Sequence, residues 1–243
     1  MPRAIVVGGS DLGESDRILR TLTAEHGRWD ALVRRARSSK KRFAGLLDLG
    51  ATLDLSARQG KGSLPVITEV DPVWTPDRGR RELERIALLQ WGCELCSATA
   101  PRDHPAPKHF GLLLHWLRLL EDDALPGRGA RHALEAKALT FAGVAPALVA
   151  CAVCALPLGG EVAFDPETGG GVHLHCGSGS VHDAAELAHL EALRRTPLKD
   201  IVDAGTAGGE SEVLNRFLTW QLGRPLKTRP WMLEVLGSDA DTR

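Results

Sequence analysis

Two pairs of metal-binding residue types lie close together in the second half of the chain. Cys151-Ala152-Val153-Cys154 holds the first pair, and His173-Leu174-His175-Cys176 holds the second. Two residues separate the members of each pair, a spacing that lets one backbone turn present both ligand atoms to a tetrahedral ion. The sequence therefore predicts a closed, structural Zn²⁺ site with the ligands Cys151, Cys154, His173 and Cys176.

Two alternatives to this ligand set stay open. His175 can replace His173, although one intervening residue is a poorer chelating spacing than two. The segment can also be a loop without metal, whose cysteines are small buried residues. A further pair, Cys93 and Cys96, lies inside an apolar helical stripe. We expect this pair to pack against a neighbouring helix, because residues i and i+3 share one helix face.

Positive charge is concentrated in residues 34–42, which contain six Lys/Arg and no Asp/Glu. The whole chain has a formal net charge of −1, whereas residues 1–62 hold 12 Lys/Arg against 7 Asp/Glu. Such a cluster repels itself unless a polyanion neutralises it, and nucleic-acid phosphate is the commonest polyanion. The alternative is a solvated loop that keeps the protein in solution. We predict that the DNA-binding residues are Arg34, Arg35, Arg37, Lys40, Lys41 and Arg42.

The hydrophobic period changes from about two to about 3.6 residues near Pro76. Short alternating segments precede this proline, and they match the strand count of an OB-type barrel. They are residues 4–7, 16–23, 28–36, 47–57 and 63–73. Helical segments follow at about 80–98, 108–121, 130–143, 184–195, 197–202, 210–222 and 229–236, and residues 151–181 have an irregular pattern. We expect the first strand, residues 4–7, to end at the turn residues Gly8-Gly9-Ser10.

These elements predict a multidomain α+β protein. We expect a five-stranded OB-type β-barrel domain over residues 1–75 that binds DNA. An all-α domain over residues 77–243 should follow, with an inserted zinc-ribbon-like loop at 148–181. A second basic patch opens the first helix, where it either extends the DNA-binding track, meets an acidic protein tail or forms a solvated face. Its residues are Arg78, Arg80, Arg81 and Arg85.

Several classes of function find no support in the sequence. The segment from Gly8 to Ser15 resembles a phosphate-binding loop in outline, but Glu14 stands where the lysine is required. We find no catalytic motif and no cluster of acidic residues for nuclease chemistry, so we expect no enzyme and no catalytic residues. No segment has the length of apolar residues that a membrane span needs, and no secretion signal opens the chain. We expect a cytoplasmic, nucleoid-associated protein.

Several segments, taken in order, resemble the RecO family of bacterial recombination-mediator and DNA-repair proteins. They span most of the chain and keep the order of the family. The matching segments are Gly13–Leu19, Leu22–Gly27, Arg37–Gly45, Glu135–Leu139, Gly143–Pro146, Cys151–Cys154 and Leu222–Arg229.

The resemblance implies an N-terminal OB domain, a helical C-terminal domain and a zinc loop. It further implies a protein that binds single- and double-stranded DNA and anneals complementary strands. The implied partners are RecR and single-stranded-DNA-binding protein, because family members help to load RecA onto strands covered by the latter. Two positions differ from the family pattern: His173 stands where zinc-binding members usually have cysteine, and Thr228 replaces a serine.

The alternative function is a zinc-ribbon scaffold for protein–protein contacts that binds DNA only incidentally. Reversing the charges of residues 34–42 separates the two functions, because a scaffold keeps its partners while an annealing protein loses its strands. A nuclease is a third class, and cleavage that depends on magnesium would reveal it.

Overall fold

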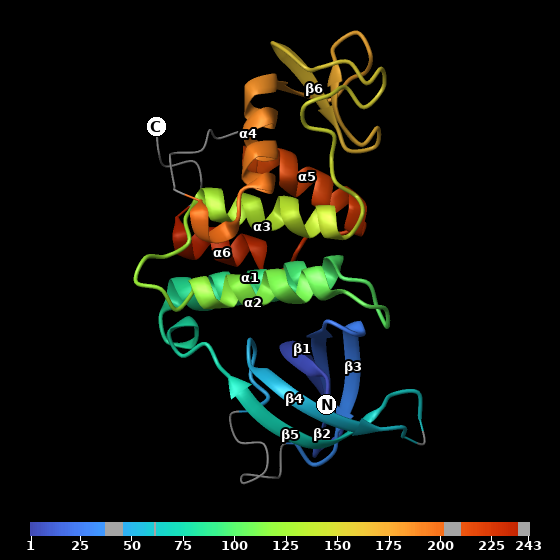
Figure 1. Ribbon diagram of the computed structural model, residues 1–243, viewed down its shortest axis with the longest axis vertical. Helices are drawn as coiled ribbons and strands as arrows, with labels where there is room; N and C mark the ends of the chain where they lie inside the picture. The colour runs from blue at the N-terminus through green and yellow to red at the C-terminus, as the bar shows by residue number, and fades with distance from the viewer. Residues whose placement is uncertain (37–45, 61, 202–209, 238–243) are drawn as a thin grey trace. The chain divides into compact units, whose positions relative to one another are not determined.

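The computed structural model describes residues 1–36, 46–60, 62–201 and 210–237 of the chain (Figure 1). It divides into two compact units, Met1–Asp123 and Ala124–Arg243. The first unit holds the strands before Pro76 together with the two helices that follow them. The domain boundary expected at residues 75–77 stays a prediction.

The first unit contains a closed five-stranded barrel. The strands follow the order β1-β2-β3-β5-β4, and β4 pairs with β1 to close the sheet. All pairings are antiparallel except that of β3 with β5, where Leu32 lies beside Val66. This order is that of an OB-type fold, as the sequence predicted. The strands are β1 (Arg3–Leu12), β2 (Asp16–Thr23), β3 (Gly27–Val33), β4 (Thr52–Arg58) and β5 (Val66–Trp74).

Alternate residues of these strands fill the barrel. Apolar side chains at every second position point inward, and polar ones point outward, as the period of two requires. Trp29 packs partly buried against this core, and the hydroxyl of Thr21 donates to its carbonyl oxygen at 2.9 Å. The buried core residues are Ala4, Val6, Leu19, Ala31, Val33, Leu47, Ala51, Leu53, Leu55 and Ile67.

Two strand boundaries differ from the expectation by five residues, and the end of β3 and the start of β5 differ by three. Strand β1 does not end at Gly8 but continues to Leu12 through an irregularity in its pairing with β2 between Val6 and Gly8. The guanidinium groups of Arg17 and Arg20 lie over the glycines, in the space where side chains at these positions would project. The fourth strand begins at Thr52, because the residues before it form turns that insert Leu47 into the core.

Helices α1 (Leu83–Thr99) and α2 (Pro107–Leu119) pack against each other and against the barrel strands. They touch closely at Gly92, where an added Cβ would lie 2.4 Å from the indole nitrogen of Trp116. Cys93 and Cys96 are buried in α1 with no disulfide, which confirms the packing role predicted for them. Burial raises the pKa of the Cys93 thiol to about 12.

Three arginines of the second basic patch are engaged within the first unit. Arg85 is buried and donates to the carbonyl oxygen of Leu120 at 2.7 Å. Arg78 donates to the carboxylate of Asp123 at 3.0 Å. Arg80 donates to the carbonyl oxygen of Leu49, also at 3.0 Å. These three side chains therefore join segments of the unit, and Arg81 is the exposed member of the patch.

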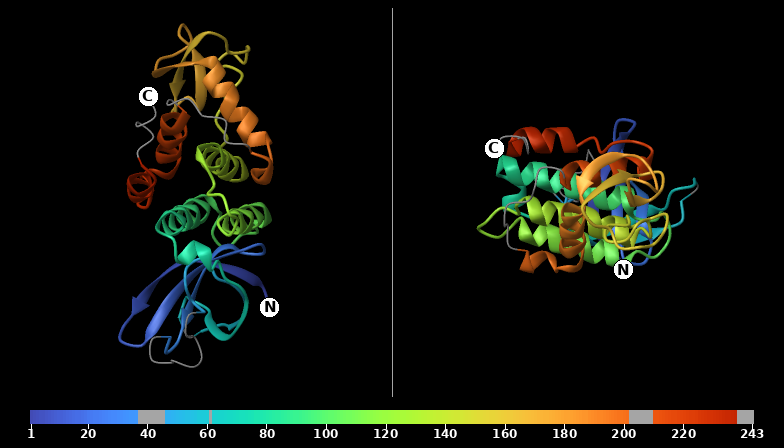
Figure 2. Two further views of the ribbon diagram at one scale, coloured as in Figure 1. Left: turned by 90° about the vertical axis from the view of Figure 1, so that its left-hand side faces the viewer. Right: turned by 90° about the horizontal axis from the view of Figure 1, so that it is seen from above.

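The second unit combines helices with a small sheet. Helix α4 extends from the sheet to α3, and α5 contacts both helices (Figures 1 and 2). The helices are α3 (Arg128–Phe141), α4 (Ala184–Arg195), α5 (Glu210–Leu222) and α6 (Arg229–Leu236). The segment 197–202, expected to be helical, contains only the single 3₁₀ turn η2 (Leu198–Asp200) among its described residues.

Residues 151–181 are more regular than the sequence indicated. They contain most of a three-stranded antiparallel sheet in the order β7-β6-β8, formed by β6 (Glu161–Asp165), β7 (Gly170–His173) and β8 (Ser180–Asp183). Phe164 of β6 joins this sheet to α5 through an edge contact with Phe217, and it makes a second edge contact with His182 of β8. Deeper in the unit, Arg229 donates to the carboxylate of Glu135, and both side chains are buried.

Candidate metal centre and nucleic-acid interface

The four residues predicted as metal ligands come together in the second unit. Their ligand atoms all lie within 4.8 Å of one another. The Nδ1 atom of His173 is 3.4 Å from the sulfur of Cys154 and 3.9 Å from that of Cys176. Ligand bonds of about 2.0–2.3 Å in a tetrahedral site place neighbouring ligand atoms about 3.5–3.8 Å apart. The cluster therefore has the size and the donor types of a site for a metal ion.

Two similar turns hold the ligand pairs. In the first turn, the N–H of Ala155 donates to the carbonyl oxygen of Cys151 at 2.9 Å. In the second turn, the N–H of Cys176 donates to the carbonyl oxygen of His173 at 2.8 Å. The residue after each second ligand is Ala155 in one turn and Gly177 in the other, and Ala155 has the left-handed φ of 61°. With two residues between the members of each pair, each turn presents both of its ligand atoms on the same side.

His173, not His175, belongs to the cluster. The Nε2 atom of His173 lies 3.1 Å from the carbonyl oxygen of Pro157, which can only accept. Nε2 therefore carries the proton, and Nδ1 presents its lone pair to the neighbouring sulfurs. His175 stacks its ring on that of His173 with a centroid distance of 5.2 Å. This stacking places His175 beside the cluster as a support for the ligand.

Backbone N–H groups favour a thiolate at this site. Burial opposes ionisation of Cys151, but backbone N–H groups of Cys154, His173 and Val153 lower the pKa of its thiol to about 6. Burial raises the pKa of Cys176 to about 11, and hydrogen bonds to the other two sulfurs act in the same direction. The site thus provides the ionised sulfur that a soft metal ion prefers.

The predicted DNA-binding segment begins directly after β3. Arg34 and Arg35 are exposed, and the N–H of Arg35 donates to the carboxylate of Asp16 at 2.8 Å. This bond ties the turn after β3 to the first residue of β2. The remaining residues of the prediction, Arg37, Lys40, Lys41 and Arg42, lie outside the described residues.

The barrel carries a charged cluster that the sequence did not predict. Arg20, Arg28 and Arg102 all approach the carboxylate of Asp30, at nitrogen–oxygen distances of 3.6, 3.7 and 3.7 Å. Arg20 lies directly opposite Asp30 in the pairing of β2 with β3. The pairing of neighbouring strands could have indicated the contact between Arg20 and Asp30. No pattern in the sequence indicates the contact of Arg102, which lies in the connection between α1 and α2.

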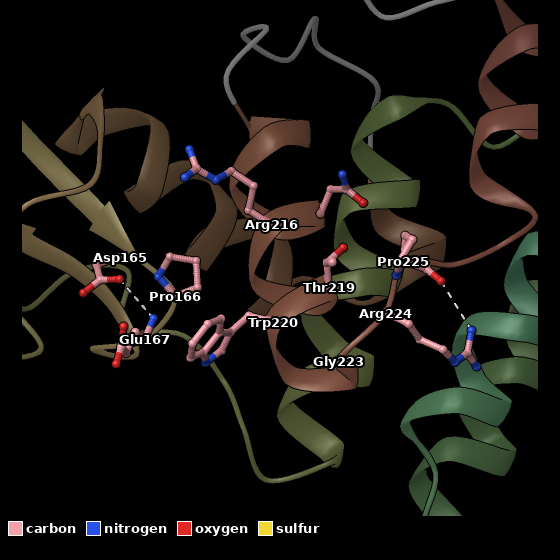
Figure 3. Close-up of a pocket in the computed structure, with 10 residues that line it drawn as sticks. Asp165, Pro166, Glu167, Arg216, Thr219, Trp220, Gly223, Arg224 and Pro225 are labelled. Atoms are coloured by element: carbon pink, nitrogen blue, oxygen red, sulfur yellow. Dashed lines mark hydrogen bonds between the residues drawn. The ribbon is translucent and has the colours of Figure 1, made fainter.

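A pocket of about 850 Å³ opens in the second unit between α5 and the turn that follows β6 (Figure 3). Its lining combines the exposed indole of Trp220 with charges of both signs. The charged lining residues are Arg216, Arg224, Asp165 and Glu167. The carboxylate of Asp165 is hydrogen-bonded within its own turn, where it accepts from the N–H of Glu167 at 3.0 Å. Equal numbers of acidic and basic side chains give this pocket no preference for a polyanion.

Two family models together match most of the chain. "Recombination protein O N terminal" matches residues 2–76, which include the barrel. "Recombination protein O C terminal" matches residues 80–230, which include the cluster of three cysteines and His173. The chain belongs to the RecO family. The family assignment implies a role in DNA repair and recombination, and it confirms the resemblance found in the sequence.

Relatives from several bacteria match over nearly the full length. A protein named DNA repair protein RecO from Myxococcus xanthus is 35% identical over 240 residues, covering 96% of each chain. One of the same name from Anaeromyxobacter dehalogenans (strain 2CP-C) is 37% identical over 242 residues, covering 95% of this chain and 94% of the relative. One from Cutibacterium acnes is 31% identical and covers 94% of this chain. Among the described residues, no helix has the length and apolar character needed to cross a membrane.

Proposed function

We propose that this RecO family member is a non-catalytic DNA-binding protein of recombinational repair. It binds single- and double-stranded DNA, anneals complementary strands, and acts as a mediator that helps to load RecA onto strands covered by single-stranded-DNA-binding protein. The observation that carries the proposal is a closed OB-type barrel whose third strand leads into the basic segment 34–42. OB-type barrels commonly bind oligonucleotides on the face of strands 2 and 3.

Annealing requires that the protein hold strands by their backbones. Basic side chains that contact phosphate leave the base edges of a strand free to pair with a second strand. Arg34 and Arg35 supply such charges at the end of β3, and Arg37, Lys40, Lys41 and Arg42 extend the series along the sequence. No covalent bond is made or broken in this process, so the protein needs positioned charge and no catalytic group.

Zn²⁺ is the metal ion that fits the Cys₃His donor set best. Cys151, Cys154, His173 and Cys176 would hold it, with the proton on Nε2 of His173 fixed by Pro157. An ion bound by four protein ligands supplies structural cross-linking and leaves no open position for a substrate. In this chain it would connect the two ligand turns to each other. It would also connect them to the small sheet, because His173 is the last residue of β7.

The proposed partners are DNA, RecR and single-stranded-DNA-binding protein, and the proposed location is the cytoplasm in association with the nucleoid. A scaffold with only incidental DNA binding is the second candidate function. One observation favours it, since four large apolar side chains near the metal ligands are exposed. They are Val149, Val153, Leu156 and Leu174.

Annealing of two labelled complementary oligonucleotides over a salt series tests the proposal. We expect the native protein to speed annealing at low salt, and the combined variant Lys40→Glu, Lys41→Glu, Arg42→Glu to lose this activity. The matched control reverses three exposed charges outside both basic clusters, Arg118→Glu, Lys199→Glu and Lys227→Glu, and should keep it. Annealing that survives the first variant, or a native protein that is folded but inactive, would favour the scaffold. Cleavage of the strands with magnesium would instead indicate a nuclease.

A further inference from the structure

The outer face of β2 and β3 carries three arginines gathered around one carboxylate. Asp30 lies on β3 with its side chain 17% exposed, and Arg20 lies opposite it on β2 at 39% exposed. Arg28, two residues before Asp30 on the same face, is 25% exposed. Arg102 is the most open of the three, at 59%. The cluster therefore holds three positive charges against one negative charge and stays accessible to solvent.

The contacts inside this cluster are loose. Nitrogen–oxygen distances of 3.6–3.7 Å exceed the length of about 2.7–2.9 Å that is typical of charge-assisted hydrogen bonds. The Nε atoms of Arg20 and Arg28 and one oxygen of Asp30 are buried without a hydrogen-bond partner among the described residues. Each guanidinium group carries five N–H donors, and one carboxylate cannot satisfy three such groups. The cluster thus has donors to spare for a second anion.

Backbone contacts fix the position of Arg102. The N–H of Arg28 donates to the carbonyl oxygen of Pro101 at 2.9 Å, and the N–H of Asp103 donates to the carbonyl oxygen of Arg28 at 3.2 Å. These two bonds hold the connection between α1 and α2 on the end of β3. Arg102 is therefore presented to the barrel face by the fold of the first unit.

We propose that Arg20, Arg28 and Arg102 form a binding site for the phosphodiester backbone of a single nucleic-acid strand, and that Asp30 is the counter-charge that a bound phosphate competes with. The inference rests on the proposed function and adds to residues 34–42 a second group of basic side chains on the same barrel. Asp30 holds the arginines by weak contacts, so a phosphate group can take the spare donors. Its negative charge also limits the affinity for the strand.

The arrangement suits an extended polyanion better than a single phosphate. Arg28 stands at one end of β3 and Arg34 follows the other end, six residues away in sequence. At about 3.3 Å per residue, six residues of a β-strand span about 20 Å. A nucleic-acid strand needs several nucleotides to cover this distance. Trp29 packs against the barrel core, so this outer face offers charge without an aromatic platform. Recognition here is therefore expected to be independent of sequence and sensitive to salt.

Fluorescence anisotropy with a labelled single-stranded oligonucleotide tests the site in the full-length protein. Arg20→Gln, Arg28→Gln and Arg102→Gln should each weaken binding by about three- to tenfold, the effect of losing one charge-assisted contact. Each should also lower the slope of log affinity against log salt by about 0.7. Asp30→Asn should strengthen binding by about three- to tenfold, since it removes the only negative charge of the cluster.

Asp54→Asn is the matched control. Asp54 pairs with Arg3 between strands β4 and β1 of the same barrel, at 3.0 Å. Equal tightening by Asp54→Asn and Asp30→Asn would show a general charge effect and overturn the proposed site. A cluster that only stabilises the barrel predicts the opposite for Asp30→Asn, namely a lower melting temperature without tighter binding, and this result would also overturn it. Arg102→Gln provides a variant outside the barrel strands, in case Arg20→Gln or Arg28→Gln does not fold.

The outcomes separate this inference from the proposed function. A native protein that binds no strand contradicts both. A native protein that binds, with affinity unchanged in Arg102→Gln, contradicts the site alone. Inorganic phosphate, added at constant ionic strength, should compete poorly. Competition at millimolar concentration would show that the cluster takes a single phosphate and would overturn the claim for an extended strand.

Discussion

The Nε2 atom of His173 lies 3.1 Å from the carbonyl oxygen of Pro157. A carbonyl oxygen can only accept, so this contact fixes the proton on Nε2 and turns Nδ1 toward the cysteine sulfurs. A histidine at this position can thus complete the cluster with three cysteines. The backbone contact sets the orientation of the imidazole ring. A cysteine at this position would need no such contact, because its side chain has no ring to orient.

The first prediction concerns metal content. We expect about one Zn²⁺ per chain, and His173→Ala or Cys154→Ser should lose it and lower the melting temperature by at least about 5 °C, because binding of a structural ion is coupled to folding. Elemental analysis and thermal unfolding measure the two effects. His175→Ala is the control and should keep the ion. Protein purified with reduced thiols and no metal would contradict the assignment.

Ala155 occupies a position that favours glycine. Its φ of 61° lies in the left-handed region, which side chains disfavour, and the residue is exposed. Ala155→Gly should therefore raise the free energy of unfolding by about 0.5–1 kcal/mol. Ala152→Gly, in the same turn but without a positive φ, should lower it. Chemical denaturation compares the two, and equal effects would show that backbone strain at residue 155 is unimportant.

Gly27 lies where the connection between α1 and α2 meets the barrel. An added Cβ would stand 2.3 Å from the carbonyl oxygen of Pro101 and 2.6 Å from that of His104. Gly27→Ala should lower the free energy of unfolding by more than about 2 kcal/mol, combining overpacking with an unfavourable φ. Gly13→Ala has a similar φ and open space around it, so it should cost only about 1 kcal/mol. Equal losses would show that the close contact costs nothing.

Glu191 makes stability depend on pH in the acid range. Hydrogen bonds from Arg194, opposed by burial and aided by Arg195, lower the pKa of its carboxyl group. A lowered pKa stabilises the folded state above the ordinary glutamate value of about 4.3, and this stabilisation is lost as the pH falls below it. Glu191→Gln should therefore reduce the loss of unfolding free energy between pH 6 and pH 3. The same loss in both proteins would contradict this role.

The sequence predicted the barrel and the grouping of Cys151, Cys154, His173 and Cys176 because both depend on short-range patterns. Alternation places apolar residues on one strand face, and a spacing of two residues lets a turn present two ligand atoms. Strand β1 was shortened in the prediction because glycines usually interrupt strands. In the structure Arg17 and Arg20 lie over Gly8 and Gly9 and take the place of missing side chains.

Two features depend on contacts that local patterns do not contain. Strand β7 begins with Gly170, where an added Cβ would lie 2.4 Å from the carbonyl oxygen of Ala147, so glycine there reflects a close approach and not a loop. The arginine cluster joins Arg20 and Arg28 to Arg102, which follows them by more than seventy positions. Backbone hydrogen bonds between the barrel and the α1–α2 connection, two of them made by Arg28, bring these residues together.

The most direct measurement is the equilibrium affinity for a single-stranded oligonucleotide as a function of salt. If the basic residues of the barrel contact phosphate, log affinity should fall with log salt with a slope of at least about 3, as expected for four or more phosphate contacts. The combined variant Lys40→Glu, Lys41→Glu, Arg42→Glu should bind more weakly and with a smaller slope. A folded native protein that binds no strand at low salt, or binds with no dependence on salt, would contradict the account.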